Sequence, residues 1–366
     1  SLKEIFKSME ADDLEYIKDK ALDFHKTQVL KDAVIQSAQI LEVDGDTDEI
    51  KALIDSAMQA GVERNLGHDY LVDIEERYSE TARVTSPTPW DIMNELMQGG
   101  LGAGELGVVV APAGIGKSWV LSAMGAYAIS QGLNVVHYTL ELNEAYVGLR
   151  YDSIFTGVES QNLKYHKEEV MEKLFDLKGN LTIKYYPTKA CTVNTLSAHL
   201  KKVTTFGKKV DMVLVDYADI MKDVGKAQEM RHALGNIYED LRGMAGELQI
   251  PVWTASQANR SALDEDVIEA SKVAESYAKV MTADFVISLS RKIEDKIGNT
   301  GRFHVIKNRF GPDGLTYPAK INTNIGKIEI FESNSVQGKG VQHKINNRDN
   351  QVKGMLSARY EDLMNE

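Results

Sequence analysis

The stretch "VVVAPAGIGKSWVL" (Val108–Leu121) decides the fold, because an apolar strand runs into a glycine-containing loop and then into a helix. The loop (Ala111–Ser118) matches the phosphate-binding pattern G-x-x-x-x-G-K-[ST], except that Ala111 replaces the first glycine. Gly114 and Gly116 allow the backbone to curl so that N–H groups point at phosphate oxygens. The helix that follows begins at the loop, so the positive end of its dipole also attracts phosphate. The sequence therefore predicts a nucleotide site in this loop.

Two further expectations concern how the phosphates and a metal are held. Lys117 is expected to reach the β- and γ-phosphates, and Ser118 to ligate Mg²⁺. Asp216 ends the apolar strand in "VLVDYADIM" (Val213–Met221) and is expected to hold Mg²⁺ through water, although a turn-capping role is the alternative. The expected nucleotide contacts are Ala113, Gly114, Ile115, Gly116, Lys117, Ser118 and Trp119.

The base that activates water is not next to the metal-side aspartate, because Tyr217 stands there. The strand after the phosphate loop reads "NVVHYTLELN" (Asn134–Asn143), and Glu141 emerges just past its C-terminal end. Glu141 is therefore predicted to orient or deprotonate a water. A helix-start carboxylate is the rival explanation, but Glu144 suits that role better. Gln257 also ends a strand, where it is either a γ-phosphate sensor or a turn residue.

The pattern of the remaining chain favours an α/β domain of the doubly wound type. The segment "TSPTPW" (Thr85–Trp90) carries two prolines and indicates a boundary, after which strands and helices alternate. This order predicts a mainly parallel sheet with antiparallel strands added late. The expected strands are Gly107–Ala111, Asn134–Thr139, Leu181–Tyr185, Met212–Asp216, Val252–Ser256, Phe285–Leu289, Arg302–Ile306 and Lys327–Phe331.

Residues 1–84 and 332–366 differ in pattern from the predicted ATPase domain (85–331). The first region carries amphipathic helical rows, one of them Leu30, Val34, Ser37 and Leu41. It is either a small bundle with the main domain or a linker that grips a neighbouring subunit. Residues 332–351 are polar and aperiodic, which predicts a flexible linker. The short amphipathic segment Val352–Met364 either docks a partner or is an idle surface helix.

Composition sets the broad class of protein. The chain has 366 residues, a net charge of −12 and a single cysteine, Cys191, which excludes an internal disulfide. No apolar run approaches the roughly 20 residues that span a membrane. A cytoplasmic protein is therefore expected, in the host cytoplasm if a phage encodes it. The acidic balance argues against a general coat for nucleic acid but allows a local basic channel.

Six segments together resemble the DnaB-like replicative helicases, which are RecA-fold ring motors. They are "APAGIGKS", "HYTLELN", "LVDYADIM", "LQIPVWTASQANR", "TADFVISLSR" and "VIKNRFGPDG", in that order over about residues 85–331. "GHDYLVDIEERY" (Gly67–Tyr78) carries a closer likeness to the T4-type bacteriophage helicases. The family's N-terminal collar domain is expected to be mostly absent from this chain, which puts primase docking in doubt. Ala111 and Phe310 depart from the family pattern.

The resemblance implies a homo-hexamer with ATP and Mg²⁺ bound at subunit interfaces. Lys307 and Arg309 match the family's finger residues, which reach into the adjacent subunit's site. From the residues alone, the two would be read as the charged face of a hairpin that turns at "GPDG" (Gly311–Gly314). Primase, a helicase loader and a polymerase are possible partners.

Two loops are expected to face a central channel and bind single-stranded DNA through phosphates. They are roughly Ala218–His232 and Asn259–Lys279, each downstream of a predicted site residue. Lysines in loops are more often simply solvated, so the assignment to DNA binding depends on the chain forming the ring that the resemblance implies. The candidate contacts are Lys222, Lys226, Arg231, Arg260 and Lys272, with Lys279 at the end of the second loop.

The resulting hypothesis is an ATP-driven hexameric helicase that translocates 5′ to 3′ on single-stranded DNA. A RecA-family recombinase filament is the second hypothesis, and the "KNRFGPDG" element and the helical linker speak against it. An ATP-gated DNA-binding switch or loader is the third. A placed base at Glu141 argues against that third hypothesis, because a switch has no need of one.

Overall fold

The computed structural model of this chain describes residues 27–40, 50, 53–54, 57, 70–71, 74, 83–225, 230–273 and 278–347. The chain divides into two units, Ser1–Ala82 and Arg83–Glu366. In the first unit residues 27–40 are helical, in agreement with one predicted amphipathic row. On this helix Leu30 and Val34, four residues apart, are 38% and 54% exposed. Whether this region packs on its own domain or on a neighbour stays a prediction.

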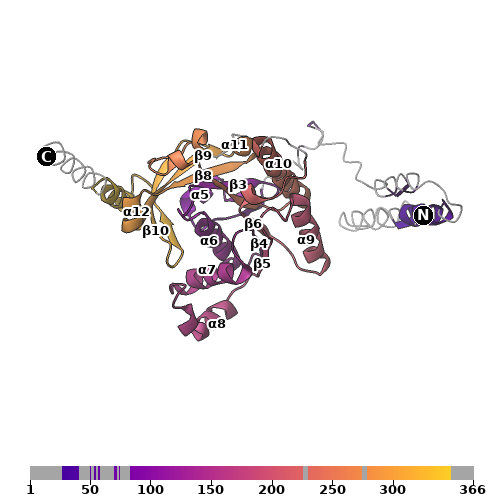
Figure 1. Ribbon diagram of the computed structural model, residues 1–366, viewed down its shortest axis with the longest axis horizontal. Helices are drawn as coiled ribbons and strands as arrows, with labels where there is room; N and C mark the ends of the chain where they lie inside the picture. The colour runs from indigo at the N-terminus through magenta and orange to yellow at the C-terminus, as the bar shows by residue number, and fades with distance from the viewer. Residues whose placement is uncertain are drawn as a thin grey trace. The chain divides into compact units, whose positions relative to one another are not determined.

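Within the described residues, the second unit is built on a nine-stranded sheet. Its strands are β3 (Leu106–Ala111), β4 (Val135–Thr139), β5 (Leu181–Tyr185), β6 (Met212–Asp216), β7 (Val252–Gln257), β8 (Phe285–Ser290), β9 (Thr300–Asn308), β10 (Thr316–Asn322) and β11 (Lys327–Ile330). They lie in the order β11-β10-β9-β8-β3-β7-β6-β4-β5 (Figure 1). The six strands from β8 to β5 are parallel, and β9, β10 and β11 are antiparallel additions. The predicted fold class is therefore confirmed.

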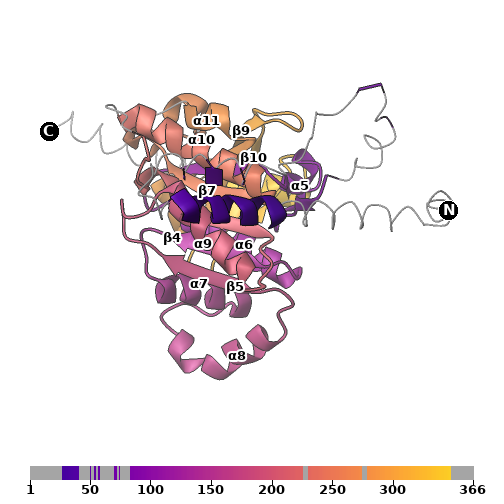
Figure 2. The ribbon, with the colours of Figure 1, turned by 90° about the vertical axis from the view of Figure 1, so that its right-hand side faces the viewer.

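Helices cover both faces of the sheet, because the central strands are apolar on both sides. They are α5 (Asp91–Leu96), α6 (Lys117–Ser130), α7 (Glu144–Thr156), α8 (Lys167–Phe175), α9 (Val193–Thr205), α10 (Met230–Leu248), α11 (Ala278–Thr282) and α12 (Ile293–Gly298). One core contains α9 and α10 with Val108 and Val110, and the other contains α5, α6 and α7 with Val109 and Ala111. Figure 2 shows α8 at the far end of the domain from α10 and α11.

Short elements complete the fold. A two-residue strand, β1 (Thr85–Ser86), pairs with β2 (Leu101–Gly102) ahead of β3. Four single turns of 3₁₀ helix lie in the loops: η1 (Leu163–Tyr165), η2 (Ala218–Ile220), η3 (Arg260–Ala262) and η4 (Ala270–Lys272). Two of these turns, η2 and η3, follow β6 and β7 directly, where the sequence predicts DNA-binding loops.

The sequence misassigned two segments late in the chain. Strand β10 was not predicted, because Pro318 stands in its middle and proline normally argues against a paired strand. Residues 336–347 form a helix where a flexible linker was expected. Ser335 caps this helix, since its Oγ accepts a hydrogen bond from the Gly338 N–H at 2.9 Å. Val341 on the helix is buried, whereas the candidate helix Val352–Met364 lies outside the described residues.

Candidate functional site

Four parallel strands end at one edge of the sheet, where the predicted site residues gather. Pairing of β3 with β7 sets Ala111 beside Gln257, and pairing of β4 with β6 sets Thr139 beside Asp216. This edge is the one where doubly wound sheets place their ligands. A cavity of about 300 Å³ opens here, lined by Ala113, Gly114, Gly116, Lys117, Ser118, Trp119, Glu141, Leu142, Arg150, Tyr217, Gln257 and Thr323.

The phosphate loop has the predicted geometry. Gly114 and Gly116 both adopt positive φ angles, 70° and 123°, which only glycine takes without strain. A Cβ atom at Gly114 would meet nothing within 4 Å, so the loop surrounds open space there. Helix α6 begins at Lys117, directly after the loop. Ile115 is the exception among the predicted contacts, because its side chain is buried in the core and leaves only its backbone for a ligand.

The Lys117 ammonium lies folded over the loop. Its Nζ atom donates to the carbonyl oxygens of Ala111 at 3.0 Å and Pro112 at 3.2 Å. Burial lowers the pKa of Lys117, while the carboxylates of Asp216, Asp219 and Glu141 raise it. A phosphate group would compete for the Lys117 ammonium with these two carbonyl oxygens, in the field of the three acids.

Asp216 is buried at the end of β6 with only 2% of its surface exposed. Burial raises the pKa of its carboxyl, and a hydrogen bond from Ser118 and the charge of Arg150 lower it. The Arg150 guanidinium lies 4.0 Å from its Oδ2 atom. No described residue donates a hydrogen bond to Oδ1. A buried carboxylate oxygen without a partner beside a serine hydroxyl is suited to a metal or its water.

Glu141 and Asp219 are the two acids that could serve as a base near the loop. Glu141 lies two residues past β4 and lines the cavity. Asp219, in η2, is occupied instead: it accepts hydrogen bonds from the Gln257 N–H at 2.9 Å and from the Tyr238 hydroxyl at 2.8 Å. Its Oδ1 atom also pairs with Lys279 at 2.9 Å. The geometry therefore favours Glu141 for the role of base.

Helix α7 begins as the sequence suggested. The Asn143 side chain caps it by accepting from the Tyr146 N–H, and Glu144 stands in its first turn. The Glu144 carboxylate accepts a hydrogen bond from the Tyr185 N–H at 3.0 Å. Glu144 therefore has a structural role, and Glu141 remains available to the cavity.

Arg150 and Thr323 are among the cavity residues that sequence reasoning missed, together with Leu142 and Tyr217. Arg150 projects from α7, and its guanidinium lies 5.3 Å from the centre of the Trp119 ring. Trp119 was predicted as a nucleotide contact and does line the cavity. Thr323 comes from the turn between β10 and β11, and its Cγ2 atom lies within 4 Å of where a Cβ on Gly116 would be. Neither residue stands in a recognisable motif, so no local signal could have identified them.

Gln257 ends β7 and lines the cavity, so its predicted position is met. Its role as a sensor stays a prediction. The backbone of Gln257 is linked to η2 through Asp219, and the neighbouring Ser256 donates to the same carboxylate at 3.2 Å. The cavity edge is thereby connected to both loops that were predicted to bind DNA.

Lys279 must be removed from the set of DNA contacts. Its side chain is 1% exposed, and its Nζ atom pairs with Asp219 and donates to Ser256 Oγ at 3.2 Å. The loop reading failed because this residue lies within α11 and points into the core rather than into solvent.

The other candidate DNA contacts differ in exposure. Lys222 and Arg260 are exposed, and Arg231 is exposed in the first turn of α10. Lys272 is half-buried and pairs with Glu265 at 2.9 Å inside the second loop. Lys226 lies outside the described residues. The DNA-binding role of the set therefore stays a prediction.

Lys307 and Arg309 lie at the opposite edge of the sheet from the phosphate loop. Lys307 is in β9, and Arg309 directly follows the strand. The Lys307 ammonium donates to the Val280 carbonyl oxygen at 2.9 Å, and Arg309 pairs with Asp284 at 2.8 Å. Asp284 also accepts from the N–H of Leu106, the first residue of β3. A six-residue strand spans about 20 Å, so Arg309 is remote from its own chain's loop.

A metal would need ligands beyond the protein. In the part of the chain that the structure describes, no group of three or more His, Cys, Asp or Glu side chains could hold a metal alone. Ser118 and Asp216 nevertheless suit the Mg²⁺ that accompanies nucleotide phosphates, since such an ion takes few protein ligands. None of the described helices is both long and apolar enough to cross a membrane.

Comparison with known proteins identifies relatives of this domain. A family model, "DnaB-like helicase C terminal domain", matches residues 87–325. The "DnaB-like replicative helicase" of Enterobacteria phage T4 is 27% identical over 282 residues, which cover 73% of this chain and 59% of that protein. The "Replicative DNA helicase DnaB" of Geobacillus stearothermophilus is 26% identical over 251 residues, covering 62% and 55%. The chain thus spans little more than half the length of these relatives.

Solved structures share the fold at lower identity. A structure described as "The Structure Of A DnaB-Like Replicative Helicase And Its Interactions With Primase" matches with a TM-score of 0.65 at 16% identity, covering 85% of this chain and 77% of that one. A structure of an isolated ATPase domain matches with a TM-score of 0.61 at 18% identity, covering 72% and 97%. These matches show that the domain has the fold of such ATPase domains.

Proposed function

The chain belongs to the family of DnaB-like helicases, and from that premise we propose that it is an ATP-driven hexameric ring. The ring would translocate 5′ to 3′ on single-stranded DNA and unwind the duplex at a replication fork. The observation that carries this proposal is the gathering of Lys117, Ser118 and Glu141 around one cavity, next to the buried carboxylate of Asp216. Such a set is suited to hydrolysis of a nucleoside triphosphate.

The chemistry follows from the charges at the cavity. Lys117 leaves the carbonyl oxygens of Ala111 and Pro112 to bind the β- and γ-phosphates, whose charge favours the protonated amine. Ser118 and Asp216 would hold Mg²⁺, which would supply positive charge against the phosphates. Glu141 orients the attacking water and accepts its proton. Gln257 senses the γ-phosphate, and Arg150, beside Asp216, is a further cation within reach of the cavity.

Completion of the site requires a second subunit. Lys307 and Arg309 lie at the far end of β3 from the phosphate loop, so they do not serve the cavity of their own chain. In a ring they would reach the γ-phosphate bound by the neighbour and stabilise the charge that develops there. Arg309 suits this task, because its side chain is 49% exposed. Asp284 would keep a second partner, Arg242, if Arg309 left it.

The DNA would pass along the loops that follow β6 and β7. Lys222, Arg231 and Arg260 would contact phosphates there, giving binding that depends on salt and tolerates any sequence. Asp219 links both loops to Gln257, which supplies a route from hydrolysis to the DNA.

Primase is a candidate partner because it accompanies one similar structure. A loader or polymerase would fit the segment Val352–Met364, outside the described residues.

The first experiment is steady-state ATP hydrolysis with and without single-stranded DNA, in the wild type and in Glu141→Gln. We expect DNA to stimulate the wild type several-fold and the variant to lose roughly 100-fold or more in kcat, the usual contribution of a general base. Glu144→Gln is the matched control and should keep its activity, because the Glu144 carboxylate bonds the Tyr185 N–H and does not line the cavity. Hydrolysis indifferent to DNA would instead favour a switch or loader. Electron micrographs that show filaments in place of closed rings would favour a recombinase.

The second experiment tests the shared site. Arg309→Ala should bind ATP but not hydrolyse it, and so should form rings that are inactive alone. Mixing it with Lys117→Ala, which keeps Arg309 but loses the nucleotide, should restore activity, because about a quarter of the interfaces in a randomly mixed ring then combine an intact loop with an intact finger. If mixing restores nothing, Arg309 acts within its own chain and the shared site is wrong.

A further inference from the structure

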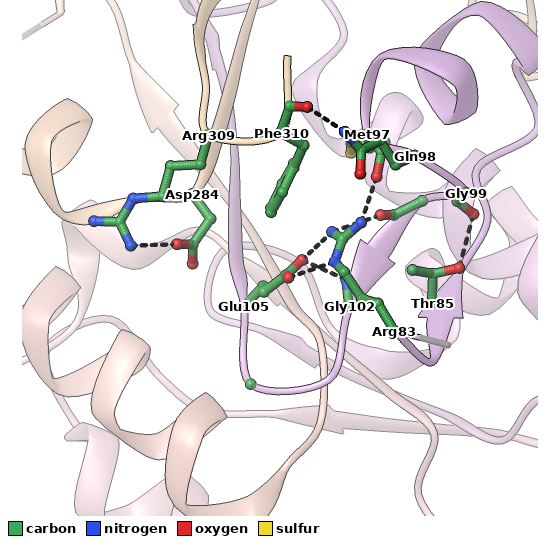
Figure 3. A network of polar contacts seen from close by, with 12 residues as sticks. Arg83, Thr85, Met97, Gln98, Gly99, Gly102, Glu105, Asp284, Arg309 and Phe310 are labelled. Atoms are coloured by element: carbon green, nitrogen blue, oxygen red, sulfur yellow. Dashed lines mark hydrogen bonds and ion pairs between the residues drawn. The ribbon is translucent and has the colours of Figure 1, made fainter. Parts of the chain in front are cut away.

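The short segment that carries Arg309 is tied to a distant part of the sequence. The Asn308 side chain donates to the Leu96 carbonyl oxygen at 2.8 Å. The Gln98 side chain donates to the Phe310 carbonyl oxygen at 2.6 Å (Figure 3). Both partners precede β3 by a few residues. The backbone on either side of Arg309 is thus held by the region where the chain enters this domain.

Arg83 holds the same segment from another direction. Its Nε atom donates a hydrogen bond to Glu105 Oε1 at 2.6 Å, and its Nη2 atom donates one to the Gly100 carbonyl oxygen at 2.9 Å. The guanidinium also binds the second Glu105 oxygen and the Met97 carbonyl oxygen. With its edges occupied in this way, Arg83 places its flat face against Phe310, with Cζ 3.8 Å from the ring centre. Figure 3 shows the ring lying over the guanidinium.

The aim of Arg309 depends on this arrangement. Its own side chain is half exposed and pairs with Asp284, while its N–H donates to the Asp284 carbonyl oxygen at 3.0 Å. The next residue, Phe310, is the one that Arg83 stacks on. Displacement of the ring would therefore turn the backbone that carries Arg309, without disturbing the phosphate loop at the other end of β3.

We propose that Arg83 is a positioning residue for hydrolysis, which acts through Phe310 to aim Arg309 at the neighbouring subunit's nucleotide. This inference rests on the proposed shared site. Arg83 is also the first residue of its unit, directly after Ser1–Ala82.

The direct test changes the ring and leaves Arg83 with its polar partners. Phe310→Leu removes the aromatic face, whereas Phe310→Tyr, the matched control, keeps it. We expect Phe310→Leu to lower the DNA-stimulated kcat for ATP by roughly 10- to 100-fold, as displacement of a catalytic group by about 1 Å does. The KM for ATP should stay within about twofold, because ATP is bound by the other end of the chain's own β3. Phe310→Tyr should resemble the wild type.

Arg83→Lys tests the other side of the stack. Lysine keeps the charge but has neither the flat face nor the fork that binds Glu105, so it should lower kcat as Phe310→Leu does. Thermal unfolding of each variant distinguishes a loss of folding from a misplaced Arg309 side chain in a folded protein. A Phe310→Leu variant that folds, forms rings and hydrolyses ATP at the wild-type rate would overturn the proposal.

A mixing experiment separates this proposal from the shared site itself. Phe310→Leu mixed with Lys117→Ala should regain activity, because the intact finger of the second protein serves the intact loop of the first. If Arg309→Ala is rescued by the same partner and Phe310→Leu is not, the shared site stands and Phe310 acts on its own chain, which overturns the inference. If neither is rescued, the shared site fails first.

Discussion

Single residues at the cavity explain how a chain without an adjacent pair of acids could still provide the base that the proposed hydrolysis needs. Tyr217 occupies the position after Asp216, and burial and the nearby Glu141 raise the pKa of its hydroxyl, so it stays neutral. The carboxylate of Asp219, the next acid in the sequence, is already hydrogen-bonded to the Gln257 N–H and the Tyr238 hydroxyl. Glu141, one strand away, is the acid that faces the cavity. We therefore propose that the neighbouring strand supplies the base.

His137 gives a pH dependence at the scale of one residue. It is fully buried in β4, its Nδ1 atom lies 2.9 Å from the Tyr151 hydroxyl, and burial lowers its pKa from 6.5 to about 3. The unfolded chain therefore binds a proton before the folded one, and stability present above pH 6.5 is lost as pH falls toward 3. Between pH 7.5 and 5 this removes about 2 kcal/mol from the free energy of unfolding.

Urea unfolding across that pH range checks the effect of His137. His137→Gln should flatten the decline by about 2 kcal/mol, even if the variant is less stable at neutral pH. The exposed His343→Gln is the control and should leave the decline unchanged. Equal slopes in all three proteins would show that another group causes the acid sensitivity.

Sequence motifs located residues that line the cavity, whereas residues whose contacts depend on distant partners were missed or misjudged. Lys117, Ser118 and Glu141 follow from strand ends and loop chemistry, and they meet at one cavity. Arg150 reaches Asp216 from a helix face, which no spacing in the sequence reveals. Lys279 was misjudged for the same reason, since its partner Asp219 is 60 residues away in sequence.

At the scale of elements, the six parallel strands were each predicted to within one residue at either end. Leu181–Tyr185 and Met212–Asp216 were predicted to the residue, although the first is only half-buried, because each is a run rich in strand-forming residues before a turn. Strand β10 pairs with neighbours on both sides despite Pro318, and the Pro318 carbonyl oxygen still accepts from the Phe331 N–H. The helix at 336–347 was hidden by Gly338 and Gly340, which lower helix propensity although the Ser335 cap starts the helix.

The contact of α6 with its neighbours provides a test at this scale. A Cβ on Gly125 would overlap the Tyr151 hydroxyl and lie 2.8 Å from Leu214 Cδ1, so Gly125→Ala should cost about 1–3 kcal/mol despite alanine's better helix propensity. Gly243→Ala, in α10 with nothing within 4 Å, is the control and should stabilise by about 0.5–1 kcal/mol. Thermal unfolding measures both, and a stabilised Gly125→Ala would mean that α6 and α7 pack less closely than described.

For the whole molecule, the sheet separates the two halves of the proposed shared site. The antiparallel strand β9 runs back along β8, so it carries Lys307 and Arg309 to the edge opposite the phosphate loop. The sequence supplied both sets of residues but not their separation, because strand order is set by the packing of all nine strands. This separation is the physical reason to expect that one chain alone hydrolyses ATP poorly and that activity depends on assembly.

The helix at residues 27–40 supplies a test of that assembly. Leu30 and Val34 lie one turn apart and are exposed, so together they offer a small apolar surface on one side of the helix. If they pack on the neighbouring subunit, Leu30→Glu with Val34→Glu should break the ring, shift the elution to smaller species and lower DNA-stimulated hydrolysis toward that of Arg309→Ala. Nucleotide affinity should stay within about twofold, since each loop remains complete. The exposed Gln36→Glu is the control and should leave rings intact. Full rings and full activity in the double variant would instead mean that other surfaces hold the subunits together.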